Sequence, residues 1–420
     1  MTDTPLENGP LTGLRVLDLS RILAGPTATQ LLGDMGADVI KIERPDHGDD
    51  TRRWGPPFVQ VNGEDSAESA YYLCANRNKR SLAVDMASEA GQRIIRDIAK
   101  ISDIVVENFK VGDLARRGLD YASLKKLNPR LIYCSISGFG QSGPYAERAG
   151  YDFLVQGMGG MMSLTGQRDA EGGVPTKVGV GIADVMCGMY AANAVLAALH
   201  AREKTGEGQY IDIALLDTQV AWLINQGTAY LTDRQPPARL GNAHPTIVPY
   251  ETFPASDRQF ILAIGNDSQF RKFLEAAGRL DLLADARFQT NVARVKNREH
   301  VVPVVAEITK TRSAADWLSV LASIGVPCGP VNNLEDVFND PQIRHREMAI
   351  TMPHKTADQG AVHLIGNPVK LSATPVTYRL PPPRVGEHSA EILRDLLNLS
   401  VQEIEALATS GAICDGRLDN

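Results

Sequence analysis

The sequence predicts an α/β fold, with a doubly wound and mainly parallel sheet followed by a smaller α+β domain. Two observations predict the sheet. Short apolar runs alternate with helical patterns over the first half of the chain, and the first of them form a strand–helix–strand unit. A third observation predicts the second domain, because the composition changes near residue 232 at the Pro-rich stretch DRQPPARLGNAHPTIVP.

The strand–helix–strand unit spans residues 14–43. LRVLDLS at 14–20 predicts a buried strand, Pro26 marks the first turn of a helix that ends near Met35–Gly36, and ADVIKIE at 37–43 predicts the next strand. Such sheets bind ligands beyond the carboxyl ends of their strands. Glu43 stands where dinucleotide-binding folds place a ribose-binding acid, but the first turn lacks GxGxxG, so NAD binding is not predicted.

Basic residues accumulate in the loops that follow. The loop 44–59 is too polar and too rich in Pro and Gly for regular structure, and the segment 89–109 predicts a helix and then a strand. Four basic residues fall near the ends of predicted strands: Arg44, Lys79, Arg80 and Lys110. That placement favours the binding of an anion. Arg52 and Arg53 are either a clamp for a carboxylate or solvated loop charges, and the sequence leaves both interpretations open.

The next strand, LIYCSIS at 131–137, leads into GFGQSGP. Its glycines formally spell GxGxxG, but Pro144 follows at once and no acid lies about twenty residues later. We therefore expect a tight loop whose backbone approaches a ligand, not a dinucleotide turn.

Residues 178–202, VGVGIADVMCGMYAANAVLAALHAR, predict a helix that is apolar almost all round and therefore buried. The longest apolar segment of the chain, which follows Asp184, is short for a membrane span and contains Asn193. Asp184 lies at the front of this helix. It is either an N-cap or a carboxylate nucleophile that the helix terminus keeps ionised. Asp152 is the one other carboxylate that we expect to point inward.

The second half of the chain predicts a strand at QYIDIAL, a helix over 215–231, a hairpin at ETFPASDRQFILAIGND and a helix at SQFRKFLEAAG. Helices near 299–310 and 314–324 follow, with Ser313 and Asp316 resembling a capping box. The chain returns at 325–343, and the tail predicts short strands and the helix EHSAEILRDLL. The expected domains are 1–230 (large), 240–332 (small) and 333–420 (a return segment that completes the large domain).

Composition narrows the class of protein. The chain has 420 residues, 43% apolar and 22% charged, with a net charge of −7, so nucleic acid and anionic membranes are not expected partners. Its five scattered cysteines suit a reducing compartment, and the start MTDTPLENGPLTG is unlike a signal peptide, which predicts a cytoplasmic protein. There is no GxSxG elbow, and the eight dispersed histidines predict no metal site.

Three runs carry a family resemblance: GYDFLVQGMGGMMSLTG (150–166), GVGIADVMCGMYAANAVLAAL, and REKTGEGQYIDIALLDTQ (202–219). Together they closely resemble the core of the CaiB/BaiF family, the class III CoA-transferases. The resemblance implies an interlocked homodimer, with a Rossmann-like large domain built from both chain ends and a smaller α+β domain. It also implies that Asp184 is the nucleophile, that coenzyme A or acyl-CoA is a substrate, and that there is no prosthetic group.

The resemblance assigns CoA contacts to motif positions in the first third of the chain. These are Leu23, Ala24, Arg44, Val84, Asp85, Met86, Asn108, Phe109, Lys110, Arg116, Ser137, Gly138, Phe139 and Gly140. Backbone groups around 137–140 and in GNAHP (241–245) are candidate oxyanion donors. The chain has no counterpart to the glycine run of the formyl-CoA:oxalate members. RPDHGDDTRRWGPPFV and GNAHPTIVPYETF look more like the dicarboxylate-using members, such as succinate–hydroxymethylglutarate CoA-transferases.

The resemblance implies transfer of CoA from a donor such as succinyl-CoA to a dicarboxylate, through an aspartyl anhydride and thioester. One alternative is a 2-methylacyl-CoA racemase or epimerase of the same superfamily. Those enzymes carry His in an AGHD stretch where this chain has AGYD, with Tyr151. A phenol ordinarily titrates near pH 10 and is a poor base at neutral pH. The other alternative is a non-catalytic CoA- or nucleotide-binding protein in which Asp184 only caps a helix.

Overall fold

The computed structural model describes residues 9–416, which form two compact units. Unit 1 comprises residues 9–161, 178–232 and 343–416, and unit 2 comprises residues 162–177 and 233–342. The start of the chain at residues 1–8, on which the expected lack of a signal peptide partly rests, lies outside the described residues.

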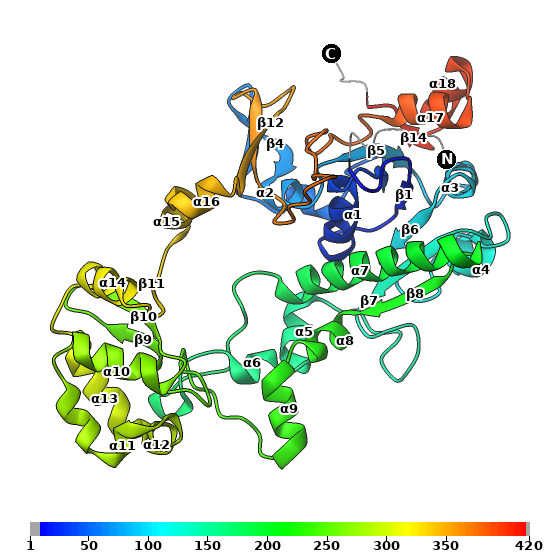
Figure 1. Ribbon diagram of the computed structural model, residues 1–420. Helices are drawn as coiled ribbons and strands as arrows, with labels where there is room; N and C mark the ends of the chain where they lie inside the picture. The colour runs from blue at the N-terminus through cyan, green and yellow to red at the C-terminus, as the bar shows by residue number, and fades with distance from the viewer. Residues whose placement is uncertain (1–8, 417–420) are drawn as a thin grey trace. The chain divides into compact units, whose positions relative to one another are not determined.

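Unit 1 is built on a seven-stranded sheet in the order β14-β5-β2-β1-β6-β7-β8 (Figure 1). Its strands are β1 (Arg15–Asp18), β2 (Asp38–Glu43), β5 (Lys79–Val84), β6 (Ile104–Glu107), β7 (Ile132–Ser137), β8 (Tyr210–Ala214) and β14 (Ile413–Cys414). All neighbours pair in parallel except β14, which pairs antiparallel with β5. The order reverses between β1 and β6, which is where a doubly wound sheet opens a ligand crevice.

Helices cover both faces of this sheet because its strands are apolar on both sides. On one face Val16, Val39 and Val106 pack against α1 (Ala24–Asp34) and α7 (Ile182–Thr205). On the other, Leu17 and Ile40 pack under helices that include α3 (Glu89–Lys100), α17 (Ser389–Leu397) and α18 (Val401–Thr409). The prediction of a doubly wound sheet completed by both chain ends is confirmed.

The helices α1 and α7 lie side by side (Figure 1). Gly188 allows this approach, since a Cβ there would come within 2.5 Å of the Ala24 carbonyl oxygen. At 24 residues α7 is about as long as the helix expected over 178–202, and, contrary to the expectation for the apolar segment after Asp184, it is long and apolar enough to cross a membrane. Just over half of its most apolar stretch, 56%, is buried in the protein. The prediction of burial all round is wrong for one face, where Met189 and Tyr190 are exposed.

Smaller elements complete unit 1. The loop after β2 contains the short 3-10 helix Asp50–Arg53 and the hairpin of β3 (Phe58–Val61) and β4 (Glu64–Ser69), so it is more regular than expected. A second hairpin joins β12 (Ala349–Pro353) and β13 (Ala361–Ile365). The remaining elements of the unit are α2 (Ala70–Leu73), η2 (Ala115–Arg117), α4 (Tyr121–Leu124), α5 (Asp152–Met158), α8 (Leu215–Ala221), and the bulk of α9 (Ile224–Asp233) and α16 (Pro341–His345).

Unit 2 has its own core around a three-stranded antiparallel sheet, β11-β10-β9. The predicted hairpin is confirmed as β9 (Tyr250–Pro254) and β10 (Gln259–Ala263), and β11 is Cys328–Pro330. Its longer helices are α10 (Asp267–Ala276), α13 (Arg298–Thr309) and α14 (Ala314–Ser323), with Trp317 fully buried between them. Short elements are α6 (Met161–Leu164), η3 (Asp169–Glu171), η4 (Leu280–Ala284), α11 (Ala286–Gln289), α12 (Asn291–Lys296) and α15 (Leu334–Asn339).

The structure differs from the sequence-based expectation in three further places. Residues 162–177 belong to unit 2, because Arg239 donates to the Gln167 carbonyl oxygen and pairs with Asp169. The helix expected over 215–231 breaks into α8 and α9, with Ile224 at φ 36°. The sequence reading missed α18, whose capping box of Ser400 and Glu403 was available as a signal.

Candidate active site

The loop between β1 and α1 forms one wall of the candidate site and has an unusual backbone. Ile22 adopts φ 72°, a left-handed conformation that is a true outlier for a β-branched residue. The Arg21 N–H donates to Asn108 Oδ1 (2.9 Å), and Asn108 Nδ2 donates to the Arg21 carbonyl oxygen (2.7 Å). The Ile22 N–H donates to the Asp49 carboxylate at 3.3 and 3.4 Å. Side chains from two other loops therefore hold this backbone in place.

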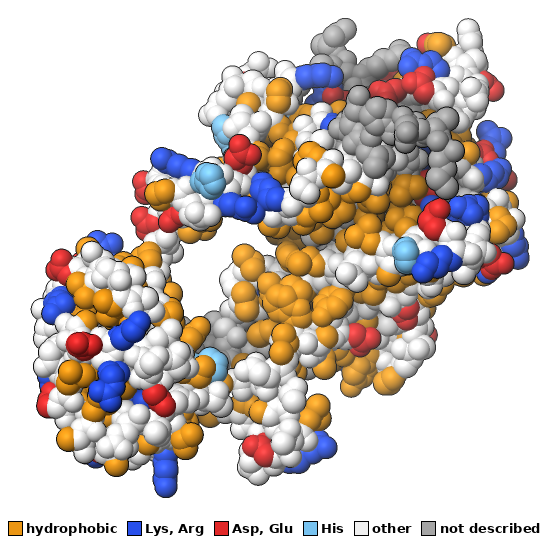
Figure 2. All heavy atoms as spheres, in the orientation of Figure 1, with side chains coloured by type: hydrophobic (Ala, Val, Ile, Leu, Met, Phe, Trp, Pro, Cys, Tyr) orange, Lys and Arg blue, Asp and Glu red, His pale blue; other side chains and the backbone are white. Residues whose placement is uncertain are grey.

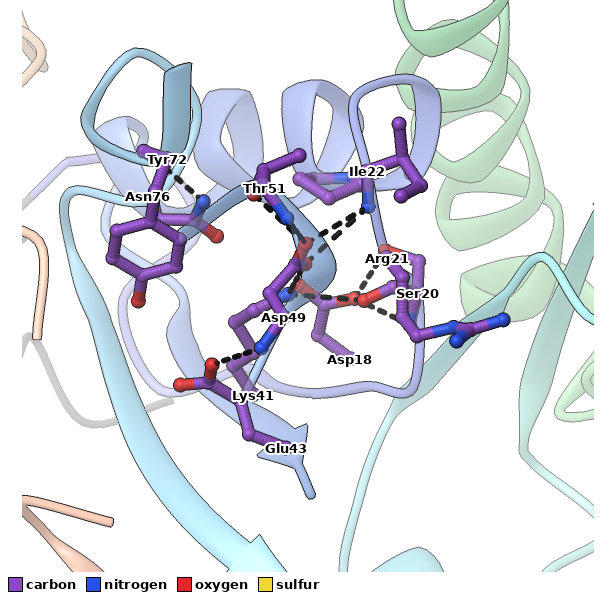
Figure 3. A network of polar contacts seen from close by, with 12 residues as sticks. Asp18, Ser20, Arg21, Ile22, Lys41, Glu43, Asp49, Thr51, Tyr72 and Asn76 are labelled. Atoms are coloured by element: carbon purple, nitrogen blue, oxygen red, sulfur yellow. Dashed lines mark hydrogen bonds and ion pairs between the residues drawn. The ribbon is translucent and has the colours of Figure 1, made fainter. Parts of the chain in front are cut away.

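A buried network of charges lies beneath the loop (Figure 3). Lys41 Nζ donates to Asp49 Oδ2 (2.9 Å) and to the Ser20 carbonyl oxygen (3.0 Å), and Asp18 accepts from Ser20 and from Lys79. Burial disfavours the charged form of Asp49, but Lys41 and the bonds from Thr51 outweigh it and hold the Asp49 pKa at about 2. The network thus consists of fixed, paired charges.

This network corrects two expectations about basic residues. Lys79 and Arg80 lie at the start of β5, away from the carboxyl edge of the sheet. Lys79 is fully buried on Asp18, and Arg80 pairs with Asp38 at 2.7 Å. Neither is available to an incoming anion. Burial lowers the Lys79 pKa to about 8 despite its bond to Asp18.

Arg52 is neither a carboxylate clamp nor a solvated charge. Its buried guanidinium forms an ion pair with Glu43, with 2.7 Å between nitrogen and oxygen, and a longer one with Glu68. The Arg52 Cζ atom also lies 3.7 Å from the centroid of the Tyr72 ring. Burial opposes the charged form of Arg52, but Glu43 outweighs it and raises the Arg52 pKa. Glu43 is committed to this pair, which removes it as a ribose-binding acid. Arg53, one residue later, is exposed.

Asp184 is the third residue of α7 and not its N-cap, which is Gly181. The capping is done by Asp152, the first residue of α5. Its Oδ1 accepts from the Ala183 N–H (2.8 Å) and, more weakly, from the Asp184 N–H (3.4 Å). Gln156 Nε2 donates to the other oxygen, Oδ2, at 2.7 Å. The first turn of α7 is therefore satisfied by a residue from another element, which leaves the Asp184 side chain unneeded as a cap.

The Asp184 carboxylate is half-buried, and among the described residues it makes no hydrogen bond or ion pair. Burial, together with the negative charge of Asp152, raises the Asp184 pKa to about 7. We expected the helix terminus to keep Asp184 ionised, but the raised pKa leaves it only partly ionised at neutral pH. Near neutral pH the carboxylate is divided between its two protonation states, and its ionised form is a comparatively strong base.

A cavity of about 480 Å³ opens in front of Asp184. Eight of the sequence-predicted residues line it: Leu23, Ala24, Asn108, Phe109, Lys110, Ser137, Gly138 and Asp184. They come from the loops after β1, β6 and β7 and from α7. The carboxyl edge of the sheet therefore brings together residues that lie far apart in the sequence.

A second cavity, of about 490 Å³, lies beyond the ends of β1, β2 and β5. Five predicted residues line it: Arg44, Val84, Asp85, Met86 and Phe109. Arg21 and Phe109 border both cavities, and the Arg21 guanidinium lies over the Phe109 ring at 5.2 Å. The two cavities are therefore neighbours that share a wall.

Three predicted residues, Arg116, Phe139 and Gly140, line neither of these two cavities as the described part of the chain forms them. Arg116 is exposed and pairs with Asp113. The Gly140 N–H donates to Ser137 Oγ at 2.9 Å and so braces its loop. The segment GNAHP belongs to unit 2, where the His244 carbonyl oxygen accepts from Arg298.

Sequence reasoning missed Arg21 and the capping role of Asp152. Arg21 lies two residues before the predicted position Leu23, and its charge was a signal that could have been used. Asp152 was recognised only as an inward carboxylate, because its bond to the start of α7 joins positions thirty-one residues apart.

The sequence matches a known protein family over most of its length. Residues 11–389 match the model of CoA-transferase family III. The chain belongs to this family. The prediction of a class III CoA-transferase is therefore confirmed, and the protein is an enzyme of acyl-CoA metabolism.

Three relatives place this CoA-transferase more closely. It is 46% identical to the succinate–glutarate CoA-transferase of Agrobacterium fabrum, over 97% of this chain and 100% of that one. It is 41% identical to the mouse succinyl-CoA:glutarate CoA-transferase, over 96% of this chain and 90% of that one. The crystal structure of a CAIB/BAIF family protein from Brucella suis superposes with a TM-score of 0.82 at 48% identity, covering 93% of this chain and 100% of that one.

Proposed function

We propose that this CoA-transferase moves CoA from succinyl-CoA to a dicarboxylic acid, with Asp184 as the nucleophile. One observation carries the proposal: the Asp184 carboxylate, free of protein partners among the described residues, faces a cavity lined by the positions to which the family resemblance assigns CoA contacts. The names of the two relatives support the choice of acids. They favour transfer over the racemase alternative.

The proposed reaction proceeds by covalent relay. The Asp184 carboxylate attacks the thioester carbonyl of succinyl-CoA. The C–S bond breaks, CoA departs as the thiolate, and an aspartyl–succinyl anhydride is formed. The thiolate then attacks the aspartyl carbonyl, which releases succinate and forms an aspartyl-CoA thioester. The acceptor carboxylate attacks that thioester, giving a second anhydride and CoA thiolate. The thiolate finally attacks the acceptor's acyl carbon, which yields the new acyl-CoA and restores Asp184.

The surroundings of Asp184 suit this relay. Its pKa of about 7 leaves a substantial ionised fraction at neutral pH and makes that fraction more basic than an ordinary carboxylate. Asp152 holds the first turn of α7 and so fixes the backbone from which Asp184 projects. The backbone of residues 137–140 remains our candidate for the oxyanion donors, because Ser137 and Gly138 line the cavity.

The second cavity suits the nucleotide end of CoA in this proposal. Arg21, Arg44 and Arg117 line it, and arginine makes charge-assisted bonds to phosphate. The wall that it shares with the Asp184 cavity, formed by Arg21 and Phe109, would then lie along the path of the pantetheine arm. CoA is a substrate here, and we propose no prosthetic group.

We further propose that the enzyme is a cytoplasmic homodimer that binds neither nucleic acid nor membranes. Apolar side chains on four helices of unit 1 support the dimer, since monomeric proteins rarely expose so many together. They are Phe153 and Leu154 of α5, Met189 and Tyr190 of α7, Val220 of α8, and Ile224 and Leu231 of α9. Figure 2 shows hydrophobic side chains gathered on the surface around the start of α7.

An acceptor screen tests the proposed reaction. Succinyl-CoA would be incubated with glutarate, malate, itaconate, mesaconate, hydroxymethylglutarate, oxalate or acetate, and each acyl-CoA product quantified by chromatography. We expect dicarboxylates of four to six carbons to give the highest kcat/KM. A preference for oxalate or acetate over all of them would contradict the substrate class, and the absence of any exchange would contradict the proposed function itself.

A further inference from the structure

A dicarboxylate brings a second negative charge into the cavity of Asp184, and that charge needs a partner. A carboxylate removed from water without a hydrogen-bonded counter-ion is costly, so a site for dicarboxylates requires a cation beside the acyl group. Three cationic side chains line the cavity: Arg21, Lys110 and Arg148. Arg21 is paired with Asp50, at 3.2 Å, and also lines the second cavity, where it is proposed to meet a CoA phosphate.

Arg148 belongs to a loop, residues 139–149, whose two ends meet. A Cβ on Gly150 would come within 2.2 Å of the Gly138 Cα, and one on Gly138 within 2.5 Å of the Gly150 Cα. Only a pair of glycines allows this contact, so the loop is closed at its base. Inside it the Arg148 N–H donates to the Tyr145 carbonyl oxygen at 2.9 Å. Compact loops of this kind, packed by their own side chains, frequently carry functional residues.

The side chain of Arg148 is held by rings and not by charges. The Arg148 Cζ atom lies 4.6 Å from the centroid of the Tyr145 ring and 5.3 Å from that of Phe139. The two rings meet edge to face, with their centroids 5.6 Å apart. Within residues 9–416, the guanidinium makes no ion pair or hydrogen bond. Cation–π contacts fix the plane of the group while leaving its N–H donors available.

We infer that Arg148 is the specificity-determining residue for the dicarboxylate, binding the carboxylate that does not react while the other end of the acid is joined to Asp184 or to CoA. This inference rests on the proposed function. A planar fork held against two rings matches the two oxygens of a carboxylate. Lys110 is a flexible point charge at a position to which the family resemblance assigns CoA contact, so it fits a phosphate or the CoA arm better.

The test compares acceptors of equal length with one and two carboxylates. For glutarate and pentanoate, kcat/KM would be measured for the wild-type enzyme and for Arg148→Gln, Arg148→Lys and Arg53→Gln. We expect Arg148→Gln to lower kcat/KM for glutarate about 100-fold, mostly through KM, and to change pentanoate less than about threefold. Arg148→Lys should recover part of the loss. Arg53→Gln, an exposed arginine outside the cavity lining, should leave the ratio of the two acids unchanged.

Binding of free CoA shows whether Arg148 contacts the carboxylate of the acid or a phosphate of CoA. If Arg148 contacts the acid, Arg148→Gln should leave the Kd of CoA unchanged by calorimetry, whereas Lys110→Gln should raise it. An unchanged glutarate-to-pentanoate ratio in Arg148→Gln would overturn the inference. So would a rise in the Kd of CoA in that variant, which would assign Arg148 to phosphate. If the wild-type enzyme exchanges no dicarboxylate at all, it is the proposed function that fails.

Discussion

Asp184 is prepared for nucleophilic attack by what surrounds it and by what does not bind it. Burial and the Asp152 carboxylate raise its pKa to about 7, and no described group ties its oxygens down. Asp152 contributes twice, because it caps the first turn of α7 and also repels charge on Asp184. These two contributions can be separated by Asp152→Asn, which keeps an oxygen for the cap and removes the charge, although it also loses the bond that Gln156 Nε2 donates to Oδ2.

We expect Asp152→Asn to move the acid limb of the pH–rate profile. In the wild-type enzyme log kcat/KM should rise with pH to a midpoint near 7, as Asp184 ionises. Asparagine caps a helix about as well as aspartate but carries no charge, so the midpoint should fall by roughly one pH unit. Asp97→Asn, a partly exposed carboxylate on α3 that pairs with Lys100, is the control. A midpoint that does not move in Asp152→Asn would mean that Asp152 has no electrostatic influence on the reacting group.

The raised pKa of Asp184 also predicts how stability depends on pH. Folding raises the pKa from its ordinary value near 4 to about 7, so between these values the folded state binds more protons and stability falls as pH rises. Asp184→Asn removes this cost. Its free energy of unfolding in urea should equal that of the wild type near pH 4 and exceed it above pH 7. We expect a difference on the order of 1 kcal/mol, reduced by the solvent that reaches a half-buried carboxylate. A variant less stable than wild type at pH 8 would contradict this account.

At the scale of elements, the loop between β1 and α1 depends on the buried charges beneath it. Asp49 is the common partner, since it binds Lys41, the Ile22 N–H and Thr51 at once. Lys41 and Asp49 are both completely buried, and breaking such a pair leaves an uncompensated charge.

We expect Asp49→Ala to lower the free energy of unfolding by about 3–5 kcal/mol. It should also raise KM for acyl-CoA, because the backbone of Ile22 loses its acceptor beside Leu23 and Ala24. Asp50→Ala, which removes a half-exposed partner of Arg21 and His47, should cost no more than about 1 kcal/mol. Urea unfolding of the two variants gives the comparison. Equal stability losses would show that the buried network does not support the loop.

Many of the strands, helices and cavity-lining positions could be predicted from the sequence, because the signals for them lie in residues close together in the chain. Apolar runs with a helix between them specify β1, α1 and β2, and the family motifs locate Asp184 and most of the cavity wall. The failures involve partners that are far apart in the chain. Nothing near Arg52 indicates that it is buried on Glu43, nothing near Lys79 reveals Asp18, and no local signal links Asp152 to the start of α7.

At the scale of the whole molecule, the exposed apolar faces of α5, α7, α8 and α9 predict a second copy of the chain. Light scattering after gel filtration should give the mass of two chains at micromolar concentration. The double variant Ile224→Glu and Leu231→Glu places two charges on this surface and should shift the mass toward that of one chain. Val401→Glu, at another exposed apolar position, on α18, should remain dimeric. A wild-type mass of one chain would contradict the proposed homodimer.

The central claim is that Asp184 carries the acyl group and then CoA through a covalent bond. Mass spectrometry of the enzyme after brief incubation with succinyl-CoA, rapid acid quenching and digestion tests it most directly. The account predicts a peptide containing Asp184 that gains the mass of CoA less one water, and no gain in Asp184→Asn, which should also lose turnover. An enzyme that exchanges CoA between succinate and glutarate while this peptide stays unmodified, or in which Asp184→Asn retains activity, would contradict the account.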